Sequence, residues 1–368
     1  MSAQPTIRLA TLLEGYAEAP SLEVRDLSID SREIGDGDVF IALAGLREHG
    51  IKHAAAAIDR GARAVIYDPA DGVSLGDIAR QVVTVPVPQL RASLGVIADR
   101  AYGSPSANMH IAGVTGTNGK TTCAWIYALC RDSSAGYIGT LGAGRHGNLW
   151  PTRHTTQDVV ALTRTLHRLC TEGARHVALE VSSHALDQGR IDGVRIPVAA
   201  FTNLTRDHLD YHGTMEAYGA AKEKLFTRSG VEVAVVNVDD PFGDGLATRL
   251  EGAVEIMRVS RHGLAHRRGR WLEAVSVDYD ASGLRIHGSS HSGPFTASAR
   301  LIGSFNVENV LVILGMLVAS GMSVVESTEA LAVADAPPGR MEVFRSDGNP
   351  LVVVDYAHTP DALAKALS

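Results

Sequence analysis

From His110 onward, short apolar runs alternate with stretches that have helical spacing. The apolar runs are of strand length and comprise His110–Val114, Val177–Val181, Val198–Asn203 and Val231–Val238. Between them, Thr156–Glu172 repeats apolar residues on one helical face from Val159 to Leu169, and Gly173 is a typical helix stop. Lys120–Arg131 is a second predicted helix. Alternation of this kind predicts a largely parallel sheet covered by helices.

The N-terminal part of the chain shows a shorter version of the same pattern. Val39–Leu43, Ala64–Tyr67 and Val82–Val85 are apolar runs of strand length, and His53–Arg60 has helical character. We therefore predict a small α/β domain over residues 1–106.

The pattern changes towards the end of the next section, residues 107–335. Trp271–Ile286 alternates as antiparallel strands do, around a turn at Asp280–Gly283. Two helical segments, Val307–Ser320 and Val324–Val333, then close the section. We predict that this section is a second domain, built mainly on the parallel sheet.

Residues 336–368 are predicted to be the start of a third domain. Ala334–Arg340 (ADAPPGR) is typical of a linker. Leu351–Val354 then predicts a strand of the buried type, and Asp361–Leu367 the beginning of a helix. Because one strand and half a helix cannot bury a core, we expect this domain to be cut short.

The composition is that of an ordinary soluble globular protein, with 45 % hydrophobic and 20 % charged residues in a chain of 368. That length suits two or three domains of about 100–200 residues each. The formal net charge of -7 gives no general attraction to nucleic acid or to an anionic membrane. We interpret the one basic run, Arg261–Arg270, as a solvated loop rather than an anion-binding patch.

The cysteines and the lack of a targeting signal in the sequence favour the cytoplasm. The three cysteines show no pairing pattern, which fits a reducing environment. The N-terminus has no basic stretch leading into an apolar core, so no secretory signal is predicted. The most apolar stretch, Val310–Ala319, is shorter than the roughly 18–20 residues that cross a bilayer. We expect a cytoplasmic protein without membrane insertion.

The strongest chemical signal is Gly113–Thr122 (GVTGTNGKTT), which follows a predicted strand and opens a predicted helix. In that context, backbone N–H groups and the helix N-terminus cradle phosphates. Lys120 would reach the terminal phosphates, and the Thr121 hydroxyl would ligate Mg²⁺. We therefore interpret the segment as a magnesium-ATP-binding loop. The alternative, a glycine-rich turn that only caps a structural helix, is disfavoured.

The spacing of the glycines narrows the class of ATP-binding protein. The general P-loop pattern has a glycine five residues before Gly119, where this chain has Val114. The loop instead carries Gly113 and Gly116, which departs from most kinases and GTPases. It resembles the loop of the ATP-dependent Mur ligases and of their relatives, the folylpolyglutamate synthetases.

Several further segments resemble the Mur ligase family, and within it the MurE type, which adds the third residue of the peptidoglycan stem peptide. They are His154–Asp158 (HTTQD), Glu180–Arg190 (EVSSHALDQGR), Thr202–His212 (TNLTRDHLDYH), Tyr218–Lys222 (YGAAK), Gly303–Asn309 (GSFNVEN), Gly339–Val343 (GRMEV) and Asp355–Asp361 (DYAHTPD). The resemblance runs from about Asp30 to the last residue. It implies an α/β architecture with three parts. These are a small N-terminal domain that binds the UDP-linked precursor, a central P-loop ATPase domain with a mostly parallel sheet, and the start of a Rossmann-like domain that binds the amino acid.

The same resemblance implies an ATP-dependent ligase that adds an amino acid to UDP-N-acetylmuramoyl-L-alanyl-D-glutamate. Forming an amide from a carboxylate requires an activated acyl group, and transfer of the γ-phosphoryl of ATP supplies one as an acyl phosphate. The catalyst must therefore gather two anions, the phosphates and the substrate carboxylate, and offset their repulsion with metal and basic groups.

By this resemblance, Lys120, Glu180, His208 and Lys222 are catalytic, and the last three hold Mg²⁺ together with Thr121. The resemblance further implies that CO₂ carbamylates Lys222 and so converts it into an anionic ligand. The plain alternatives are a salt-bridged carboxylate near the surface for Glu180 and a solvated helix lysine for Lys222. A zinc cluster around His208 is disfavoured, because the spacing does not suit a tetrahedral site with cysteines.

The remaining site residues are assigned by the same resemblance. The ATP-binding residues are Gly116, Thr117, Asn118, Gly119, Lys120, Thr121, Thr122, Asn306, Arg340 and His358. The acceptor-binding residues are Ser31, His154, Thr155, Thr156, Ser182, Gln188 and Arg190. Two of these residues have other interpretations. Asn306 alone would also suit a helix cap, and Ser182 could be a hydrolase nucleophile, although no Gly-x-Ser-x-Gly elbow surrounds it.

The family's selector for the incoming amino acid, an Asp-Asn-Pro-Arg type motif, does not occur in this sequence. Meso-diaminopimelate and lysine both stay open, and the stretch Thr155–Arg190 and the segment Asp355–Asp361 resemble the diaminopimelate branch more closely. Three hypotheses follow: a MurE-type ligase, a related Mur or folylpolyglutamate-type ligase, and a catalytically inactive nucleotide-binding module. We expect a monomer whose partners are the UDP-linked precursor and an amino acid, and no nucleic acid.

Overall fold

The computed structural model describes residues 6–45, 48–69, 73–280, 283–344, 350–358 and 360–367. The chain divides into two compact units that are not continuous in sequence. Unit 1 comprises Met1–Pro105, Gln157–Arg168 and Gly189–Val194. Unit 2 comprises Ser106–Thr156, Leu169–Gln188 and Arg195–Ser368.

A parallel sheet with the strand order β3-β4-β5-β6 forms the centre of unit 1. Its strands are β3 (Leu27–Ser28), β4 (Val39–Ala42), β5 (Ala64–Tyr67) and β6 (Val83–Pro86). All four residues of β4 are buried, as expected for a parallel strand whose two faces are both covered. The sequence prediction of a small α/β domain is confirmed for this unit.

Short helices and a long one cover the sheet of unit 1. They are α1 (Leu9–Leu12), α2 (Ala54–Asp59), α3 (Ile78–Gln81) and α4 (Leu90–Ala101), with a 3-10 turn at Gly50–His53 and a small ladder of β1 (Ile7–Arg8) with β2 (Glu23–Val24). In α4, Leu90, Leu94 and Ile97 recur at helical spacing and are all buried in one hydrophobic core. That spacing explains why this segment forms a helix packed along one face.

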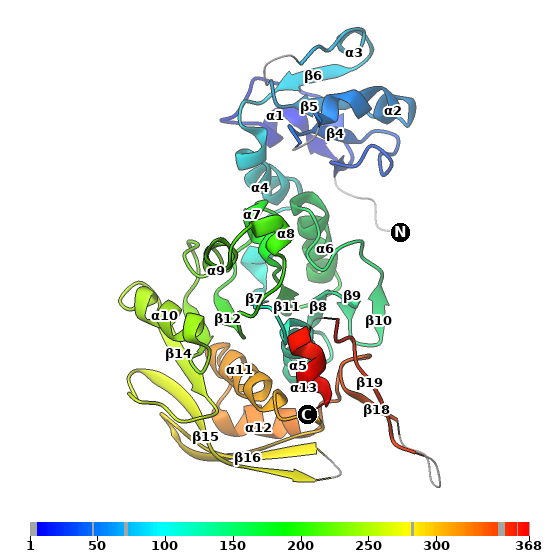
Figure 1. Ribbon diagram of the computed structural model, residues 1–368. Coiled ribbons are helices and arrows are strands. Elements are labelled where there is room, and N and C mark those ends of the chain that lie inside the picture. The colour runs from blue at the N-terminus through cyan, green and yellow to red at the C-terminus, as the bar shows by residue number, and fades with distance from the viewer. Residues whose placement is uncertain are drawn as a thin grey trace. The chain divides into compact units, whose positions relative to one another are not determined.

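Among the described residues of unit 2, eleven strands form one sheet in the order β10-β9-β8-β11-β7-β12-β13-β14-β15-β16-β17 (Figure 1). The parallel strands are β7 (His110–Thr115), β8 (Gly136–Gly139), β11 (His176–Glu180), β12 (Val198–Phe201), β13 (Val233–Asn237), β14 (Glu255–Ser260) and β15 (Arg270–Asp280). Antiparallel strands extend both ends, namely β9 (Gly142–Arg145) and β10 (Asn148–Trp150), and β16 (Gly283–Ser290) and β17 (Gly293–Ala299). The predicted parallel sheet and the predicted antiparallel pairing of β15 with β16 are both confirmed.

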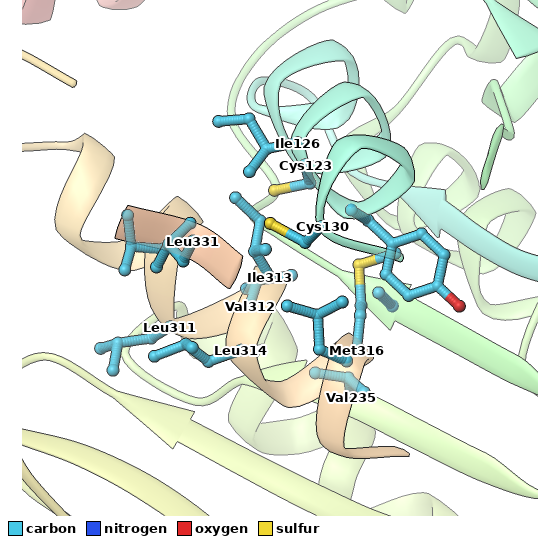
Figure 2. Close-up of a cluster of buried hydrophobic side chains, with 14 of the residues drawn as sticks. Cys123, Ile126, Cys130, Val235, Leu311, Val312, Ile313, Leu314, Met316 and Leu331 are labelled. Atoms are coloured by element: carbon cyan, nitrogen blue, oxygen red, sulfur yellow. The ribbon is translucent and has the colours of Figure 1, made fainter. Parts of the chain in front are cut away.

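The hydrophobic core of unit 2 lies between this sheet and three helices. The helices are α5 (Lys120–Arg131), α11 (Asn306–Ala319) and α12 (Val324–Ala332). Figure 2 shows side chains of α5, α11 and α12 gathered with Val235 of β13. Helix α11 is buried almost all round, because it packs against α5 as well as against the sheet. Burial of α5 fixes the direction of the phosphate loop that precedes it.

Helix α6 (Val159–Thr171) begins three residues later than the predicted Thr156–Glu172. The side chain of Asp158 accepts hydrogen bonds from the backbone N–H groups of Val160 (3.0 Å) and Ala161 (3.1 Å), so it caps the first turn. The predicted stop at Gly173 is confirmed, since this glycine has a φ of +90°. Most of α6 belongs to unit 1, whereas α7 (Ser183–Asp187), α8 (Leu209–His212), α9 (Met215–Glu223) and α10 (Pro241–Leu250) belong to unit 2, and a 3-10 turn spans Pro105–Asn108.

The last described segment is a hairpin of β18 (Glu342–Phe344) with β19 (Val352–Val354), followed by α13 (Pro360–Leu367). The prediction that Leu351–Val354 is a buried strand is wrong. Val352 is 51 % exposed, and every residue of β19 is exposed. Within the described part of the chain, β19 pairs only with β18, so no second layer covers its apolar side chains. Among the described residues, no helix is long and apolar enough to cross a membrane.

Candidate functional site

The phosphate loop lies between β7 and α5 at the carboxyl end of the parallel strands, where such sheets hold their ligands. Its turn depends on Gly116 and Gly119, which have φ values of +151° and +88°. A Cβ atom at Gly116 would collide with the hydroxyl of Thr202, and one at Gly119 with the side-chain oxygen of Asn309. The closely packed glycines let the backbone of the loop approach a phosphate, and α5 directs its N-terminus to the same place.

Neighbouring segments fix the loop from outside. The backbone N–H of Thr117 donates to the carbonyl of Asn203 (2.8 Å), and that of Asn118 donates to the side-chain oxygen of Asn203 (3.0 Å). The Thr117 hydroxyl donates to the carbonyl of Thr205 (3.1 Å) and lies 3.2 Å from the hydroxyl of Tyr218. The loop after β12 therefore holds the phosphate loop in shape.

Lys120 lies folded against its own loop. Its ammonium donates to the carbonyl oxygens of Gly116 and Thr117, each at 2.9 Å. Burial lowers the pKa of Lys120, while the carboxylate of Glu180 opposes that effect. A bound phosphate would offer this ammonium a charged partner in place of two neutral carbonyls.

Glu180 is the last residue of β11 and is completely buried. The hydroxyls of Thr121 (3.0 Å) and Thr140 (3.1 Å) donate to its Oε2. The hydroxyl of Tyr137 (2.5 Å) and the backbone N–H of Thr140 (3.0 Å) donate to its Oε1. The alternative of a salt-bridged carboxylate near the surface is therefore wrong, because this carboxylate is held in the interior by four neutral donors.

Lys222, on α9, is 1 % exposed, so the alternative of a solvated helix lysine is wrong. Its Nζ donates to the carbonyl oxygen of Gly116 (2.8 Å) and lies 4.3 Å from the centre of the Tyr218 ring. Burial first, and then the positive charge of Lys120, lower the pKa of Lys222 well below its ordinary value. A buried amine with a depressed pKa is available as a neutral nucleophile.

His208 precedes α8 in the left-handed region, with a φ of +51°, and its side chain is 42 % exposed. Its Nε2 lies 3.4 Å from a carboxylate oxygen of Asp207, and its ring packs edge-on against that of His184, with centroids 4.8 Å apart. Burial lowers the pKa of His208, so the neutral imidazole that metals bind is favoured. Among the described residues, no group of three or more His, Cys, Asp or Glu side chains could hold a metal ion by itself.

Three of the predicted nucleotide contacts, which are far apart in the sequence, line a single pocket of unit 2 with the phosphate loop. Asn306 opens α11, Arg340 follows α12, and His358 lies in the segment before α13. Arg340 also donates to the Thr121 hydroxyl (3.4 Å) and lies over the ring of Tyr356. Asn306 donates from its side chain to the carbonyl of Ile302 (2.7 Å), so it also stabilises the start of the helix.

The predicted acceptor residues fall in both units. Ser31 and Arg190 belong to unit 1, where Ser31 lies in the turn after β3. In unit 2, the buried Thr156 hydroxyl donates to the carbonyl of Glu180 (2.8 Å), and the Ser182 side chain accepts from the N–H of Ala185 (3.2 Å) and caps α7. These bonds make Thr156 and Ser182 part of the support of β11, the strand that ends at Glu180.

The other acceptor residues of unit 2 lie nearer the surface. His154 is exposed and Thr155 is partly exposed. The hydroxyl of Thr155 lies 3.1 Å from that of Thr140, while Gln188 donates to the hydroxyl of Tyr211 (3.1 Å). These side chains can contact a ligand on the same edge of the sheet as the phosphate loop.

Five residues of this site escaped the sequence reasoning: Tyr137, Thr140, Tyr218, Asn309 and Tyr356. Three of them lie inside segments already recognised by resemblance, namely YGAAK, GSFNVEN and DYAHTPD. Tyr137 and Thr140 carried no signal, because only the pairing of β8 with β11 brings them to Glu180.

Comparisons with known proteins agree with this geometry. A family model described as the Mur ligase middle domain matches residues 114–317, and one described as Mur ligase family, catalytic domain, matches residues 23–102. A protein of Xanthomonas campestris pv. campestris (strain 8004), named UDP-N-acetylmuramoyl-L-alanyl-D-glutamate--2,6-diaminopimelate ligase, is 44 % identical over 366 residues. The match covers 98 % of this chain and 72 % of that protein.

The structure is also similar to solved structures of ligases. The structure of a UDP-N-acetylmuramoyl-L-alanyl-D-glutamate--2,6-diaminopimelate ligase matches with a TM-score of 0.81 and 34 % identity, over 99 % of this chain and 74 % of that chain. A Mycobacterium tuberculosis folylpolyglutamate synthase complexed with ADP and AMPPCP matches with a TM-score of 0.59 and 17 % identity, over 75 % of this chain and 69 % of that chain. The second likeness is one of fold alone.

Proposed function

Because the chain belongs to the Mur ligase family, we propose that it uses ATP to join meso-diaminopimelate to UDP-N-acetylmuramoyl-L-alanyl-D-glutamate in peptidoglycan synthesis. The observation that carries the choice of reaction is the 44 % identity along 98 % of this chain to a protein named for it. The site described above supplies the groups that such a ligation needs.

The proposed reaction has two steps. An oxygen of the acceptor carboxylate forms a bond to the γ-phosphorus of ATP, and ADP leaves, which gives an acyl phosphate. The amine of the incoming amino acid then attacks the acyl carbon, and inorganic phosphate leaves while the nitrogen loses a proton. Lys120 and the N–H groups of the phosphate loop would hold the anionic phosphates during the first step.

The residues present fit magnesium-ATP. The Thr121 hydroxyl and a carboxylate oxygen of Glu180 lie 3.0 Å apart, so two oxygen ligands of the kind that Mg²⁺ prefers share one place beside the phosphate loop. Bound magnesium would neutralise phosphate charge and orient the γ-phosphoryl group. Because the protein offers few ligands, phosphate oxygens and water would complete the coordination.

We further propose that Lys222 is carbamylated. The neutral amine attacks the carbon of CO₂, a nitrogen–carbon bond forms, and the nitrogen loses one proton to give a carbamate. The buried position and depressed pKa of Lys222 favour the neutral amine that this step needs. The product would place an anion beside Lys120, and this anion could bind a metal ion or accept a hydrogen bond from the Lys120 ammonium.

The carbamate is tested with Lys222→Ala, which should lose turnover and regain part of it when short carboxylates such as acetate or formate are added. Lys222→Arg is the matched control, since it keeps a cation that cannot be carbamylated and should not be rescued. Turnover is measured by phosphate release with the full set of substrates. Full activity of Lys222→Ala would refute the assignment.

The substrate assignment is tested by calorimetric titration of the 368-residue chain with UDP-N-acetylmuramoyl-L-alanyl-D-glutamate. The precursor that carries L-alanine alone is the control ligand. Preferential binding of the dipeptide form supports the proposal. Equal or absent binding, with ATP still bound, would contradict it and favour a related ligase or an inactive nucleotide-binding module.

We also propose that the chain works as a monomer in the cytoplasm, where ATP and nucleotide-linked precursors are available. Sedimentation equilibrium in the presence of ATP and the UDP-linked precursor should give the mass of one chain, 38.9 kDa. A stable dimer under those conditions would contradict this part of the proposal.

A further inference from the structure

Thr140 connects the buried carboxylate of Glu180 to the partly exposed Thr155. It follows directly after β8, and its backbone N–H and its hydroxyl bond to the two different oxygens of Glu180 (3.0 and 3.1 Å). The same hydroxyl lies 3.1 Å from that of Thr155. Gly139 makes this approach possible, because a Cβ atom there would collide with the Glu180 carboxylate.

Each threonine hydroxyl has only one proton, and this fixes which group donates in each of these hydrogen bonds. A carboxylate oxygen only accepts, so the single hydroxyl proton of Thr140 belongs to the bond with Glu180. Thr140 must then accept from Thr155, and the oxygen of Thr155 keeps its own lone pairs for a donor. A ligand that donates an N–H or O–H to Thr155 would complete a chain of donors that all point towards Glu180.

From this geometry we propose that Thr140 is a positioning residue that couples acceptor binding to metal-nucleotide binding. The inference rests on the proposed function, in which Thr155 contacts the UDP-linked precursor and Glu180 holds magnesium. An N–H or O–H of the precursor donates to Thr155, the chain of hydroxyls becomes polarised in one direction, and Glu180 is held more firmly in place. The precursor therefore raises the affinity for magnesium-nucleotide, and the reverse holds by linkage.

Tyr137 provides an internal comparison. Its hydroxyl bonds to Oε1 of Glu180 at 2.5 Å, and the residue is buried against Trp125 with ring centroids 5.4 Å apart. In contrast to Thr140, Tyr137 has no bond to Thr155. Loss of the Tyr137 hydroxyl would thus weaken the support of Glu180 while the chain from Thr155 stays intact.

The experiment measures the dissociation constant of magnesium-AMPPNP by calorimetry, with and without saturating UDP-N-acetylmuramoyl-L-alanyl-D-glutamate. The protein is the complete 368-residue chain, as wild type and as Thr140→Val, Thr140→Ser and Tyr137→Phe. Thr140→Val keeps the shape and the backbone bond to Glu180 but lacks the hydroxyl, whereas Thr140→Ser keeps the hydroxyl. Thermal unfolding of each variant verifies that it is folded.

We expect the precursor to tighten nucleotide binding by about fivefold in the wild type and in Thr140→Ser. Thr140→Val should show no such tightening, and its affinity without precursor should fall by about fivefold, the effect of one hydrogen bond. Tyr137→Phe should bind nucleotide more weakly and still show the tightening. If Thr140→Val does not fold, Thr155→Val breaks the same chain from the other end and should abolish the tightening at saturating precursor.

The outcomes distinguish this inference from the proposed function. Precursor binding with no tightening in the wild type would overturn the coupling and leave the proposed function standing. A fivefold tightening that persists in Thr140→Val, or in Thr155→Val, would also overturn it. Absence of any precursor binding to the wild type would overturn the proposed function itself, and the coupling with it.

Discussion

We predict that the stability of the fold falls in acid because of His176, which lies at one end of the central sheet. His176 begins β11 beside His110 of β7, with ring centroids 5.9 Å apart. The guanidinium of Arg131 donates to Nε2 of His176 at 2.8 Å, while the buried Nδ1 has no hydrogen-bond partner among the described residues. Burial, Arg131 and His110 together lower the pKa of His176 to about 4, against a weaker opposing effect of Asp132.

Whether acid raises or lowers the stability follows from proton binding by His176 in the folded and the unfolded chain. In the unfolded chain a histidine titrates near 6.5, so between pH 6.5 and 4 the unfolded state binds the proton that the folded state refuses. The stabilisation is therefore complete above pH 6.5 and is lost as the pH falls towards 4. A difference of 2.5 pKa units corresponds to at most ~3.4 kcal/mol. Solvent screening at this partly exposed side chain reduces the expected effect to about 1 kcal/mol.

The assay is urea unfolding of the wild type and of His176→Gln between pH 7.5 and 5. Glutamine still offers Arg131 an acceptor oxygen but takes up no proton, so His176→Gln should lose about 0.6 kcal/mol less stability over this range, which covers 1.5 of the 2.5 pKa units. The exposed His262 supplies the control, since His262→Gln should follow the wild type. Parallel stability curves for the wild type and His176→Gln would refute the reasoning.

Two further substitutions test local features of unit 2. Gly119→Ala should abolish magnesium-ATP binding measured by calorimetry, because the position has a φ of +88° and a Cβ would collide with Asn309. Gly213→Ala, at a φ of +78° in open space, is its control and should cost only about 1–2 kcal/mol of stability with ATP binding retained. Ser323→Ala should lower the free energy of unfolding by about 1 kcal/mol, because Ser323 and Glu326 form a capping box at the start of α12, and an unchanged urea midpoint would contradict that role.

The elements of the central sheet could be predicted because buried parallel strands have continuous apolar runs. β7 and β13 both lie within the predicted segments or one residue beyond them. The start of α6 was misplaced because the predicted segment included the polar residues Thr156–Asp158, whereas the apolar spacing begins at Val159 and Asp158 caps the helix. The exposure of β19 could not be predicted, since an apolar run does not reveal whether a second layer covers it.

In the candidate site, too, some residues could be predicted from the sequence and others could not. The phosphate loop was predictable because its chemistry lies in one contiguous segment, and the other residues became candidates only by resemblance. The approach of Thr140 to Glu180 depends on the register in which Ile138 of β8 lies beside Leu179 of β11. Such a register is set by packing across the whole sheet, and a single sequence does not encode it in any local pattern.

The charged groups around the phosphate loop explain why this site should attract anions. Lys120 and Lys222 both donate to the carbonyl oxygen of Gly116, and each is buried. Arg340 approaches the same loop through Thr121, while Glu180 is the buried carboxylate nearby. Burial lowers the pKa of both lysines, and the charge of Lys120 lowers that of Lys222 further, so two ammonium groups side by side are disfavoured here. Phosphate binding and carbamylation of Lys222 would both supply negative charge beside Lys120 and Arg340, so each should raise the thermal stability of the chain.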